Sequence, residues 1–497
     1  MLRIAHEAMS HFYQKSYARF LSEMPHFKSV QENKLKHIDQ EIYSYQEFVK
    51  KFPLTTYSDY EIQIKKMRSD GNIKFHPTSG STHERKWIPY TDALKKEFDA
   101  GVSPWLGDLY RSFPKIKLGK HYWSLSWLPN DLRQSSSCND VDILPWWKQE
   151  FLKRIMAVPS QVQYQKTSEE SIISSLTYLC SCPDLALISI WSPTYLLSFL
   201  DCLQSNKDEV SCYLSKGKWS YSLPCPKNPK QADILAHSPN VVDSHFLQEL
   251  WPQLGLISSW DTGSSQHWSQ KLRELFSHCS FQGKALLTTE AVITIPFHNL
   301  HLLAYQGHFF EFIDQSNNEV LPSWELRPGM KVTPVVSTGS GFLRYKIPDL
   351  LYVEQFYKGL PVLRFLGRMR DIDMVGEKIS PEVAEICMQG MKEINKDICP
   401  ISLIAVEGER KSSYYCMLIE GDETTNLSSY LEKLLKTHYH YSVARDLNQL
   451  SEAKVVITPK ARSIYQALFE NRGMVSGEIK IEPLCLVKEI ELIKELS

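Results

Sequence analysis

Residues 77–86 read Pro77-Thr78-Ser79-Gly80-Ser81-Thr82-His83-Glu84-Arg85-Lys86, which places hydroxyl groups, a glycine and a lysine in one short segment. Hydroxyl and exposed backbone N–H groups donate hydrogen bonds to a polyphosphate, and Gly80 lets the backbone approach it closely. Lys86 adds a mobile positive charge. The spacing of a Walker phosphate loop does not occur here. Taken alone, a Ser/Thr-rich segment of this kind is more often an ordinary turn, with a phosphate-binding loop of another kind as the alternative.

The segment resembles the Thr-Ser-Gly-Ser/Thr-Thr-Gly-x-x-Lys loop of the adenylate-forming superfamily, which contains acyl-CoA ligases, peptide-synthetase adenylation domains and luciferases. Downstream, Leu287-Thr288-Thr289-Glu290 resembles that superfamily's Thr-Glu motif. The resemblance implies that Lys86 and Glu290 are catalytic and that Glu290 also holds Mg²⁺, a cation that prefers oxygen ligands. It implies ATP contacts for Thr78, Ser79, Gly80, Ser81, Thr82 and Thr289.

Two later motifs narrow the resemblance. The run Gly341-Phe342-Leu343-Arg344-Tyr345-Lys346-Ile347-Pro348-Asp349 is similar to a segment of the plant auxin- and jasmonate-conjugating acyl-acid amido synthetases, the Gretchen Hagen family. The run Phe365-Leu366-Gly367-Arg368-Met369-Arg370-Asp371-Ile372 resembles the superfamily's Gly-Arg-x-x-Asp hinge. These matches imply that Tyr345, Asp349 and Arg368 bind the nucleotide, Asp349 through the ribose hydroxyls, and that Asp371 is the hinge pivot.

Three further stretches extend the resemblance over roughly residues 75 to 480. Residues 191–197 (Trp-Ser-Pro-Thr-Tyr-Leu-Leu) and 250–263, which begin Leu-Trp-Pro and end Trp-Asp-Thr-Gly, are similar to bacterial members of the family. Residues 473–483 resemble its closing segment, in which a lysine follows a Gly-rich turn. This match implies that Lys480 is catalytic, and the chain is identified as a bacterial-type member of the family.

The family resemblance implies an enzyme that adenylates a small carboxylic acid with ATP and Mg²⁺ and transfers the acyl group to an amine, most simply an amino acid. The expected architecture is α/β, with β-sheets sandwiched by helices in a large N-terminal domain (residues 1–370) and a small, mobile α+β lid (residues 371–497). Mobility suits two half-reactions, because one site can be closed differently for each step. An acyl-CoA ligase that shares the adenylation step is an alternative.

Four residues depart from the motifs. His83 and Pro348 stand where glycines are usual, Lys346 replaces an arginine, and Glu478 replaces the lysine of the broader superfamily's ending. A Cβ at 83 disfavours positive φ, and Pro348 removes a backbone N–H. The departures leave two alternatives: a divergent active enzyme, or a protein that binds nucleotide without turning it over.

Hydrophobic periodicity supports the mixed architecture. Strands are predicted at residues 285–297 and 332–353, where apolar and β-branched residues alternate, and Thr338-Gly339-Ser340-Gly341 breaks the second segment. Further candidate strand regions are residues 401–420 and 453–459. The apolar stretch 185–200 predicts a buried strand followed by a core helix, and the proline-rich segment 204–244 predicts a surface excursion with short helices. Helical patterns cover residues 92–100, 169–179, 194–203, 267–276 and 381–395.

The composition limits the kinds of molecule that the protein is expected to bind. The formal charge of the 497-residue chain is -1, from 56 basic and 57 acidic side chains, which favours small-molecule substrates over nucleic acid. The eleven cysteines form no Cys-x-x-Cys pair, and the N-terminus lacks the apolar core of a signal peptide. We expect a cytoplasmic protein that uses no membrane anchor and is a monomer or a weak oligomer.

Two side-chain sets have both a functional and an ordinary interpretation. The aromatic residues Tyr122, Trp123, Trp127, Trp146 and Trp147 could line an acyl pocket, although ordinary core packing is the favoured interpretation for any one of them. His438 and His440 would share one face if that segment were a strand, but two histidines alone seldom make a metal site.

Overall fold

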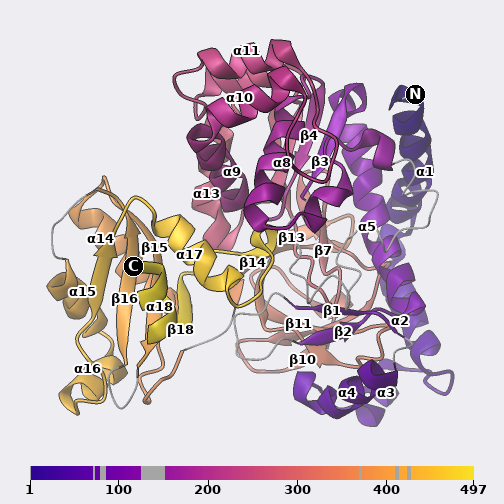
Figure 1. Ribbon diagram of the computed structural model, residues 1–497. Coiled ribbons are helices and arrows are strands. Elements are labelled where there is room, and N and C mark those ends of the chain that lie inside the picture. The colour runs from indigo at the N-terminus through magenta and orange to yellow at the C-terminus, as the bar shows by residue number, and fades with distance from the viewer. Residues whose placement is uncertain are drawn as a thin grey trace. The chain divides into compact units, whose positions relative to one another are not determined.

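The computed structural model describes residues 2–70, 73–78, 86–124, 152–368, 372–408, 413–422 and 427–496. The chain divides into two compact units (Figure 1). The first contains Met1–Thr78 and Lys86–Leu366, and the second contains Gly367–Ser497. Both units combine helices with sheets, which confirms the α/β prediction.

An eight-stranded sheet forms the centre of the first unit, with the strand order β10-β9-β11-β13-β14-β8-β7 and β12 paired to β11. The sheet carries β-branched and aromatic side chains that are fully buried, such as Ile295, Phe310 and Val336. The strands are β7 (Thr294–Phe297), β8 (Leu300–Leu303), β9 (Phe309–Asp314), β10 (Val320–Pro322), β11 (Lys331–Ser337), β12 (Tyr345–Lys346), β13 (Asp349–Tyr357) and β14 (Leu360–Arg368).

The two strand predictions in this sheet need one correction. The segment 332–353 forms β11, β12 and the start of β13, and the break between β11 and β12 covers residues 338–344, which include the predicted break at 338–341. Residues 285–293, predicted as strand, instead fold back on themselves through an isolated bridge between Leu287 and Val292. The Thr288 hydroxyl caps this turn by accepting a hydrogen bond from the Ala291 N–H at 3.1 Å, so the strand begins only at Thr294.

A parallel four-stranded sheet of order β3-β4-β5-β6 lies in the same unit. The apolar stretch 185–200 forms the fully buried strand β4 and then helix α9, as predicted. Three short helices lie in and just after the proline-rich segment. The elements are β3 (Lys120–Trp123), α8 (Ser168–Cys180), β4 (Leu185–Ser189), α9 (Pro193–Ser205), α10 (Lys207–Lys216), α11 (Pro229–His237), α12 (Ser244–Leu250), β5 (Leu256–Trp260), α13 (Gln266–Leu275) and β6 (Ser280–Lys284).

Four α-helices at the N-terminus of this unit are followed by a β-hairpin and then by a long helix. The elements are α1 (Leu2–Glu23), α2 (Phe27–Ile38), α3 (Tyr45–Lys51), α4 (Glu61–Asp70), the antiparallel pair β1 (Phe75–Pro77) and β2 (Trp87–Pro89), and α5 (Asp92–Ser112). Helix α1 crosses α5 at Gly107, where a Cβ would stand 2.6 Å from the Tyr13 carbonyl oxygen. Only glycine permits this close approach of the two helices.

The second unit is built on a four-stranded sheet of order β17-β16-β15-β18. β15 pairs antiparallel with β16, whereas β18 and β17 pair parallel to β15 and β16. The strands predicted at 401–420 and 453–459 and the helix predicted at 381–395 are confirmed. The elements are α14 (Pro381–Ile394), β15 (Cys399–Glu407), β16 (Tyr414–Glu420), α15 (Ser428–Leu435), α16 (Tyr439–Asp446), β17 (Lys454–Ile457), α17 (Ala461–Glu470), β18 (Leu484–Lys488) and α18 (Glu489–Leu496).

The extended interpretation of the histidine pair is wrong. His438 is the N-cap residue of α16 and His440 lies in that helix, whose first turn is closed by a hydrogen bond from the Ser442 N–H to the His438 carbonyl. The described residues contain no cluster of three or more His, Cys, Asp or Glu side chains arranged to bind a metal.

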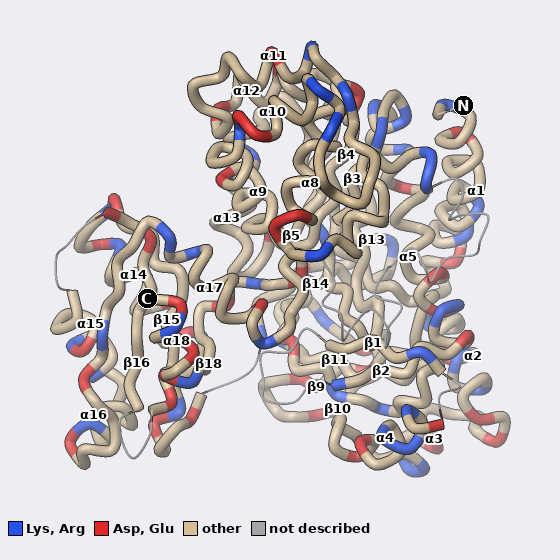
Figure 2. Tube along the Cα trace, viewed as in Figure 1, with Lys and Arg blue, Asp and Glu red and all other residues tan. Residues whose placement is uncertain are grey.

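Charged residues of both signs are spread over the described chain (Figure 2). Lys and Arg are interspersed with Asp and Glu along both units (Figure 2). Within the described ranges, no helix is both long enough and apolar enough to cross a bilayer.

Candidate active site

The hairpin of β1 and β2 carries the phosphate-loop segment at its tip. The Thr78 N–H donates to the Lys86 carbonyl at 2.9 Å, so these two residues face each other where the strands end. Ser79, Gly80, Ser81, Thr82 and His83 lie outside the described residues. The hairpin therefore fixes both ends of the predicted loop, and Thr78 and Lys86 are the two members of it that the structure places.

Lys86 is half-buried and directly precedes β2. Its ammonium nitrogen lies 5.6 Å from the centre of the Tyr57 ring, close enough for a cation–π attraction. The Tyr57 hydroxyl also accepts a hydrogen bond from the Trp87 N–H at 2.8 Å. Tyr57 thus supports the Lys86 side chain and fixes the backbone next to it.

The turn 287–292 presents the Thr-Glu motif. The Tyr90 hydroxyl donates to the Thr289 carbonyl at 3.1 Å, which ties the turn to the strand end that follows Lys86. Glu290 is buried, with 8% of its surface exposed. Burial raises the pKa of the Glu290 carboxyl, whereas its own backbone N–H and the positive charge of Lys86 lower this pKa.

Asp349 is close enough to Glu290 to interact with it electrostatically. It is the first residue of β13, is 3% exposed, and follows a tight turn in which its N–H donates to the Ile347 carbonyl at 2.8 Å. Its negative charge contributes to the raised pKa of Glu290. The structure therefore brings two predicted site residues, Lys86 and Asp349, each within electrostatic reach of a third, Glu290, and Pro348 does not prevent this.

The other predicted residues occupy different surroundings. Tyr345 is buried in β12, and its ring stacks on Phe342 with centroids 4.8 Å apart. Arg368 is half-buried at the end of β14. Lys480 lies in the second unit, where its carbonyl accepts a hydrogen bond from the Tyr465 hydroxyl at 3.3 Å. The roles of these three residues stay predictions.

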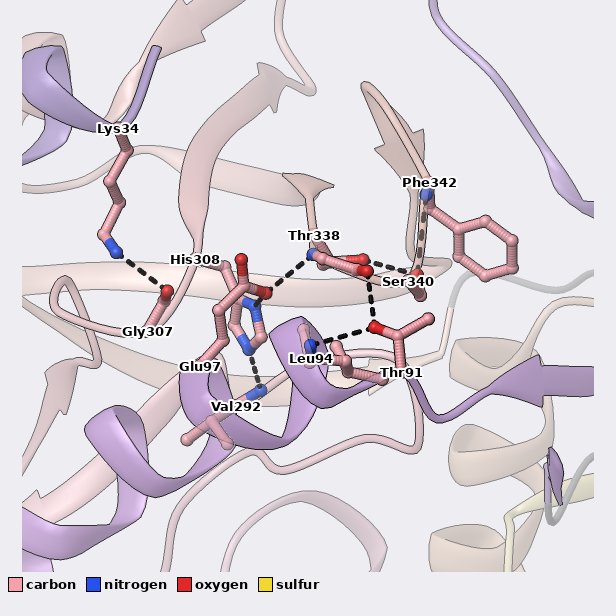
Figure 3. Close-up of polar contacts among 12 residues, drawn as sticks. Lys34, Thr91, Leu94, Glu97, Val292, Gly307, His308, Thr338, Ser340 and Phe342 are labelled. Atoms are coloured by element: carbon pink, nitrogen blue, oxygen red, sulfur yellow. Dashed lines mark hydrogen bonds and ion pairs between the residues drawn. The ribbon is translucent and has the colours of Figure 1, made fainter. Parts of the chain in front are cut away.

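Sequence analysis missed a polar cluster that contacts the turn of Glu290 through Val292 (Figure 3). His308 donates from Nδ1 to the Glu97 carboxylate at 2.8 Å, and the same Glu97 oxygen accepts from the Gly339 N–H at 2.8 Å. Thr91, the N-cap of α5, donates its hydroxyl to the Gly339 carbonyl at 2.6 Å. Only Thr91 has a sequence signal, a threonine preceding a helical pattern. Nothing near Glu97 or His308 in the sequence indicates their contact.

A buried lysine marks the carboxyl ends of the parallel strands. Lys284, the last residue of β6, is 3% exposed, and its ammonium lies 3.8 Å from the centre of the Trp191 ring. It also lies 5.9 Å from the Trp123 ring centre and 5.8 Å from that of Trp105. Tyr122 instead packs towards Phe199, with ring centres 6.3 Å apart. Of the aromatic set, Trp123 therefore meets a cation and Tyr122 lies in the core, whereas Trp127, Trp146 and Trp147 lie outside the described residues.

Comparison with known proteins gives consistent matches. The chain matches the GH3 family N-terminal domain over residues 29–281 and the GH3 family central domain over residues 301–368. A solved GH3.15 acyl acid amido synthetase is similar with a TM-score of 0.77 at 16% identity, covering 96% of this chain and 95% of the other. The same synthetase from a complex with 2,4-DB gives a TM-score of 0.78 at 17% identity, with 97% and 95% covered. No curated protein sequence matches the chain.

The two solved structures share the fold of this chain across almost its whole length. The family match is independent of that likeness, and its N-terminal part alone covers more than half of the chain. It also includes the hairpin that ends at Thr78 and Lys86, whereas the central match includes Asp349. The chain belongs to the GH3 family, the Gretchen Hagen family that its motifs resemble.

Proposed function

We propose that this protein is an acyl-acid amido synthetase that activates a small carboxylic acid with ATP and transfers the acyl group to an amino acid. One observation carries the proposal: the buried carboxylate of Glu290 lies in the fields of Lys86 and Asp349, at the end of the hairpin that bears the phosphate loop. A buried carboxylate with a cation nearby is an expected feature of a site that handles a polyphosphate. Family membership supports the same assignment.

Mg²⁺ fits the donor set. Glu290 and Asp349 repel each other when both are ionised, and a divalent cation next to Glu290 would relieve this repulsion. Since the described residues hold no three-residue metal cluster, phosphate oxygens and water would complete the coordination, as is usual for this ion. Bound there, Mg²⁺ would neutralise the charge of the phosphates.

The chain's own residues would serve the first half-reaction. The substrate carboxylate attacks the α-phosphorus of ATP, pyrophosphate leaves, and the developing negative charge requires nearby cations. We assign this work to Lys86 in the domain of residues 1–370 and to Lys480 in a lid of residues 371–497. In the second half-reaction, an amine nitrogen attacks the acyl carbon and AMP leaves, so no serine or cysteine nucleophile is needed.

We place the acid next to Lys284. The ends of parallel strands form a common edge at which ligands bind in α/β sheets, and Lys284 stands at this edge among indole rings. A cation with aromatic neighbours suits a carboxylate that carries an apolar body. Lys284 also precedes the turn of Glu290 directly in the chain, so the acid and the phosphates would be held by adjoining residues. The relative in complex with 2,4-DB supports a small acid.

Carboxylate-dependent exchange of labelled pyrophosphate into ATP tests the adenylation step. The experiment uses a panel of aryl and alkyl acids and the variants Lys86→Ala and Glu290→Ala. Lys74→Ala is the matched control, because Lys74 is an exposed lysine at the start of the same hairpin. We expect exchange that is lost in both site variants and kept in the control. ATP binding without exchange for any acid would favour the nucleotide-binding alternative suggested by His83 and Pro348.

An acceptor screen then separates amide from thioester formation. The purified protein is incubated with the active acid, ATP and either a mixture of amino acids or coenzyme A, and the products are identified by mass spectrometry. An acyl amide is the expected product, whereas an acyl-CoA thioester would favour the ligase alternative. The ten described cysteines are all free thiols, which fits a reducing compartment such as the cytoplasm.

A further inference from the structure

His308 connects three segments that are far apart in the sequence (Figure 3). Its Nδ1 lies 2.8 Å from the Glu97 carboxylate on α5, and its Nε2 lies 3.1 Å from the backbone N of Val292. The imidazole is fully buried. Val292 closes the turn that presents Glu290, and Glu97 also binds the Gly339 N–H in the loop before Tyr345 and Asp349.

The hydrogen-bond partners fix the protonation state of the ring. The Val292 N–H can only donate, so Nε2 must accept and therefore carries no proton. Nδ1 then carries the single proton and donates it to Glu97. His308 thus works as a neutral imidazole, because a proton on Nε2 would place two donors against each other.

The Glu97 oxygen completes the connection on the other side. One carboxylate oxygen accepts from both His308 Nδ1 and the Gly339 N–H, and Thr91 on the same helix binds the Gly339 carbonyl. The first turns of α5 therefore hold both the N–H and the carbonyl of Gly339. This close contact requires glycine at position 339, because a Cβ there would stand 2.7 Å from the Ala93 Cβ.

We propose that His308 and Glu97 are positioning residues that clamp the turn of Glu290 and the loop of residues 338–341 onto helix α5, and so fix the relative positions of Glu290 and Asp349. This inference rests on the proposed function, which places those two carboxylates in the site that handles the phosphates of ATP. Neither His308 nor Glu97 is assigned a contact with substrate. A misplacement of about 1 Å in such a site reduces rates by roughly 100-fold.

The clamp is sensitive to acid. Burial lowers the pKa of His308, the hydrogen bond and negative charge of Glu97 raise it, and the positive charge of Lys34 lowers it. Lys34 approaches from α2, where its ammonium donates to the Gly307 carbonyl at 2.9 Å. As the pH falls through this lowered pKa, His308 takes up a proton and the bond from the Val292 N–H is broken.

Three variants separate the parts of the clamp. Glu97→Gln keeps one oxygen that can accept both hydrogen bonds but removes the charge that favours a protonated His308. His308→Asn keeps a donor near the Nδ1 position and removes the acceptor for the Val292 N–H. Asp92→Asn is the matched control, because it removes a carboxylate from the exposed first turn of the same helix.

The test combines a spectroscopic readout with amide exchange. In protein labelled with [¹⁵N]histidine, the signals lost in His308→Asn identify His308, and we expect a neutral ring with its proton on Nδ1. The pKa of this ring should fall in Glu97→Gln and stay unchanged in Asp92→Asn. By hydrogen–deuterium exchange, peptides covering residues 286–293 should exchange faster in His308→Asn than in the native protein. A proton on Nε2, or unchanged exchange in those peptides, would overturn the proposal.

Pyrophosphate exchange at pH 8 supplies the functional readout. We expect kcat/KM to fall at least 10-fold in His308→Asn and to stay within about threefold in Glu97→Gln and Asp92→Asn. Equal activity in His308→Asn and the native protein would refute the positioning role. If the native protein shows no exchange with any acid, the proposed function fails, whereas the ring spectra and the amide exchange still decide whether the clamp exists.

Discussion

Arg344 and Glu311 form a buried ion pair beneath the loop that leads to Asp349. The guanidinium donates from Nε and Nη2 to the carboxylate at 2.8–3.1 Å, with 4% and 1% of the two side chains exposed. Arg344 also holds a positive φ of 47°, and its Nη1 donates to the Phe52 carbonyl at 2.8 Å. The motif residue next to Tyr345 thus anchors the loop rather than the nucleotide.

Loss of Glu311 should destabilise the first unit strongly. In Glu311→Ala the buried guanidinium loses its counter-charge, and such a loss costs about 3–5 kcal/mol. Arg364→Ala is the control, since it breaks the exposed pair with Glu354, which is worth about 0–1 kcal/mol. Urea unfolding measures both changes. Equal shifts in the two variants would mean that the Arg344–Glu311 pair contributes no more than a surface pair.

Glu290→Gln should reduce activity. The amide keeps the size of the side chain but loses the charge that the proposal uses to hold Mg²⁺ and the phosphates, so we expect a drop in pyrophosphate exchange of roughly 100-fold. In the free protein the pKa of Glu290 is raised by burial, so kcat/KM, which reports the free enzyme, should fall with acid at a higher pH than for an exposed glutamate. Exchange measured across pH in both proteins checks this.

The same variant should gain stability at neutral pH. Because the folded-state pKa of Glu290 lies above its value in the unfolded chain, ionisation at neutral pH penalises the folded state. Glutamine removes the penalty. The gain in melting temperature should shrink as the pH falls towards 4.5 and disappear below it, where the carboxyl is protonated in the unfolded chain too. A variant that is less stable than the native protein at pH 7.5 would contradict the burial argument.

Local sequence patterns were sufficient to predict most of the helices and strands. Thr167 and Ser380 precede helices as caps, and the apolar run 185–200 gave a strand and a helix because both are buried. The pattern that starts at residue 92 was predicted to end at 100, yet α5 continues through Gly101 and Pro104 to Ser112. Burial of Trp105 and Leu109 against neighbouring elements outweighs the cost of these two helix breakers, and no local rule contains that information.

Of the residues at the site, only those that lie in recognisable motifs could be predicted from the sequence. The motif residues Glu290 and Asp349 are recognisable from short segments. Their proximity depends on a turn at 287–292, and the sequence of that turn has the residue alternation typical of a strand. Glu97 and His308 carry no motif, because their partnership exists only after α5 packs beside the sheet. Lys284 resembles any solvated lysine until the strand order of the parallel sheet is known.

Thr91 should matter for ATP binding beyond its role as a helix cap. Its hydroxyl accepts from the Leu94 N–H at 3.1 Å and donates to Gly339, so Thr91→Ala loses both a cap and a loop contact. Thr167→Ala is the matched control, because Thr167 caps α8 through the same kind of bond, from the Glu170 N–H at 3.1 Å. Each change should cost about 1 kcal/mol of stability. Isothermal titration should show weaker ATP binding in Thr91→Ala alone; similar affinity in both variants would limit Thr91 to capping.

Lys284→Met tests where the acid binds. Methionine keeps an unbranched apolar chain among the Trp191, Trp123 and Trp105 rings but removes the charge proposed to bind the substrate carboxylate. Loss of a charged hydrogen bond costs about 1.5–3 kcal/mol, so the KM for the acid should rise at least 10-fold while the affinity for ATP stays within about threefold. Lys271→Met is the control, since Lys271 also lies over an indole, with its ammonium 4.8 Å from the Trp268 ring centre, but on helix α13. An unchanged KM for the acid in Lys284→Met would move the acid away from the edge of the parallel sheet, whereas an equal loss of ATP binding would indicate that the lysine supports the fold of the whole site.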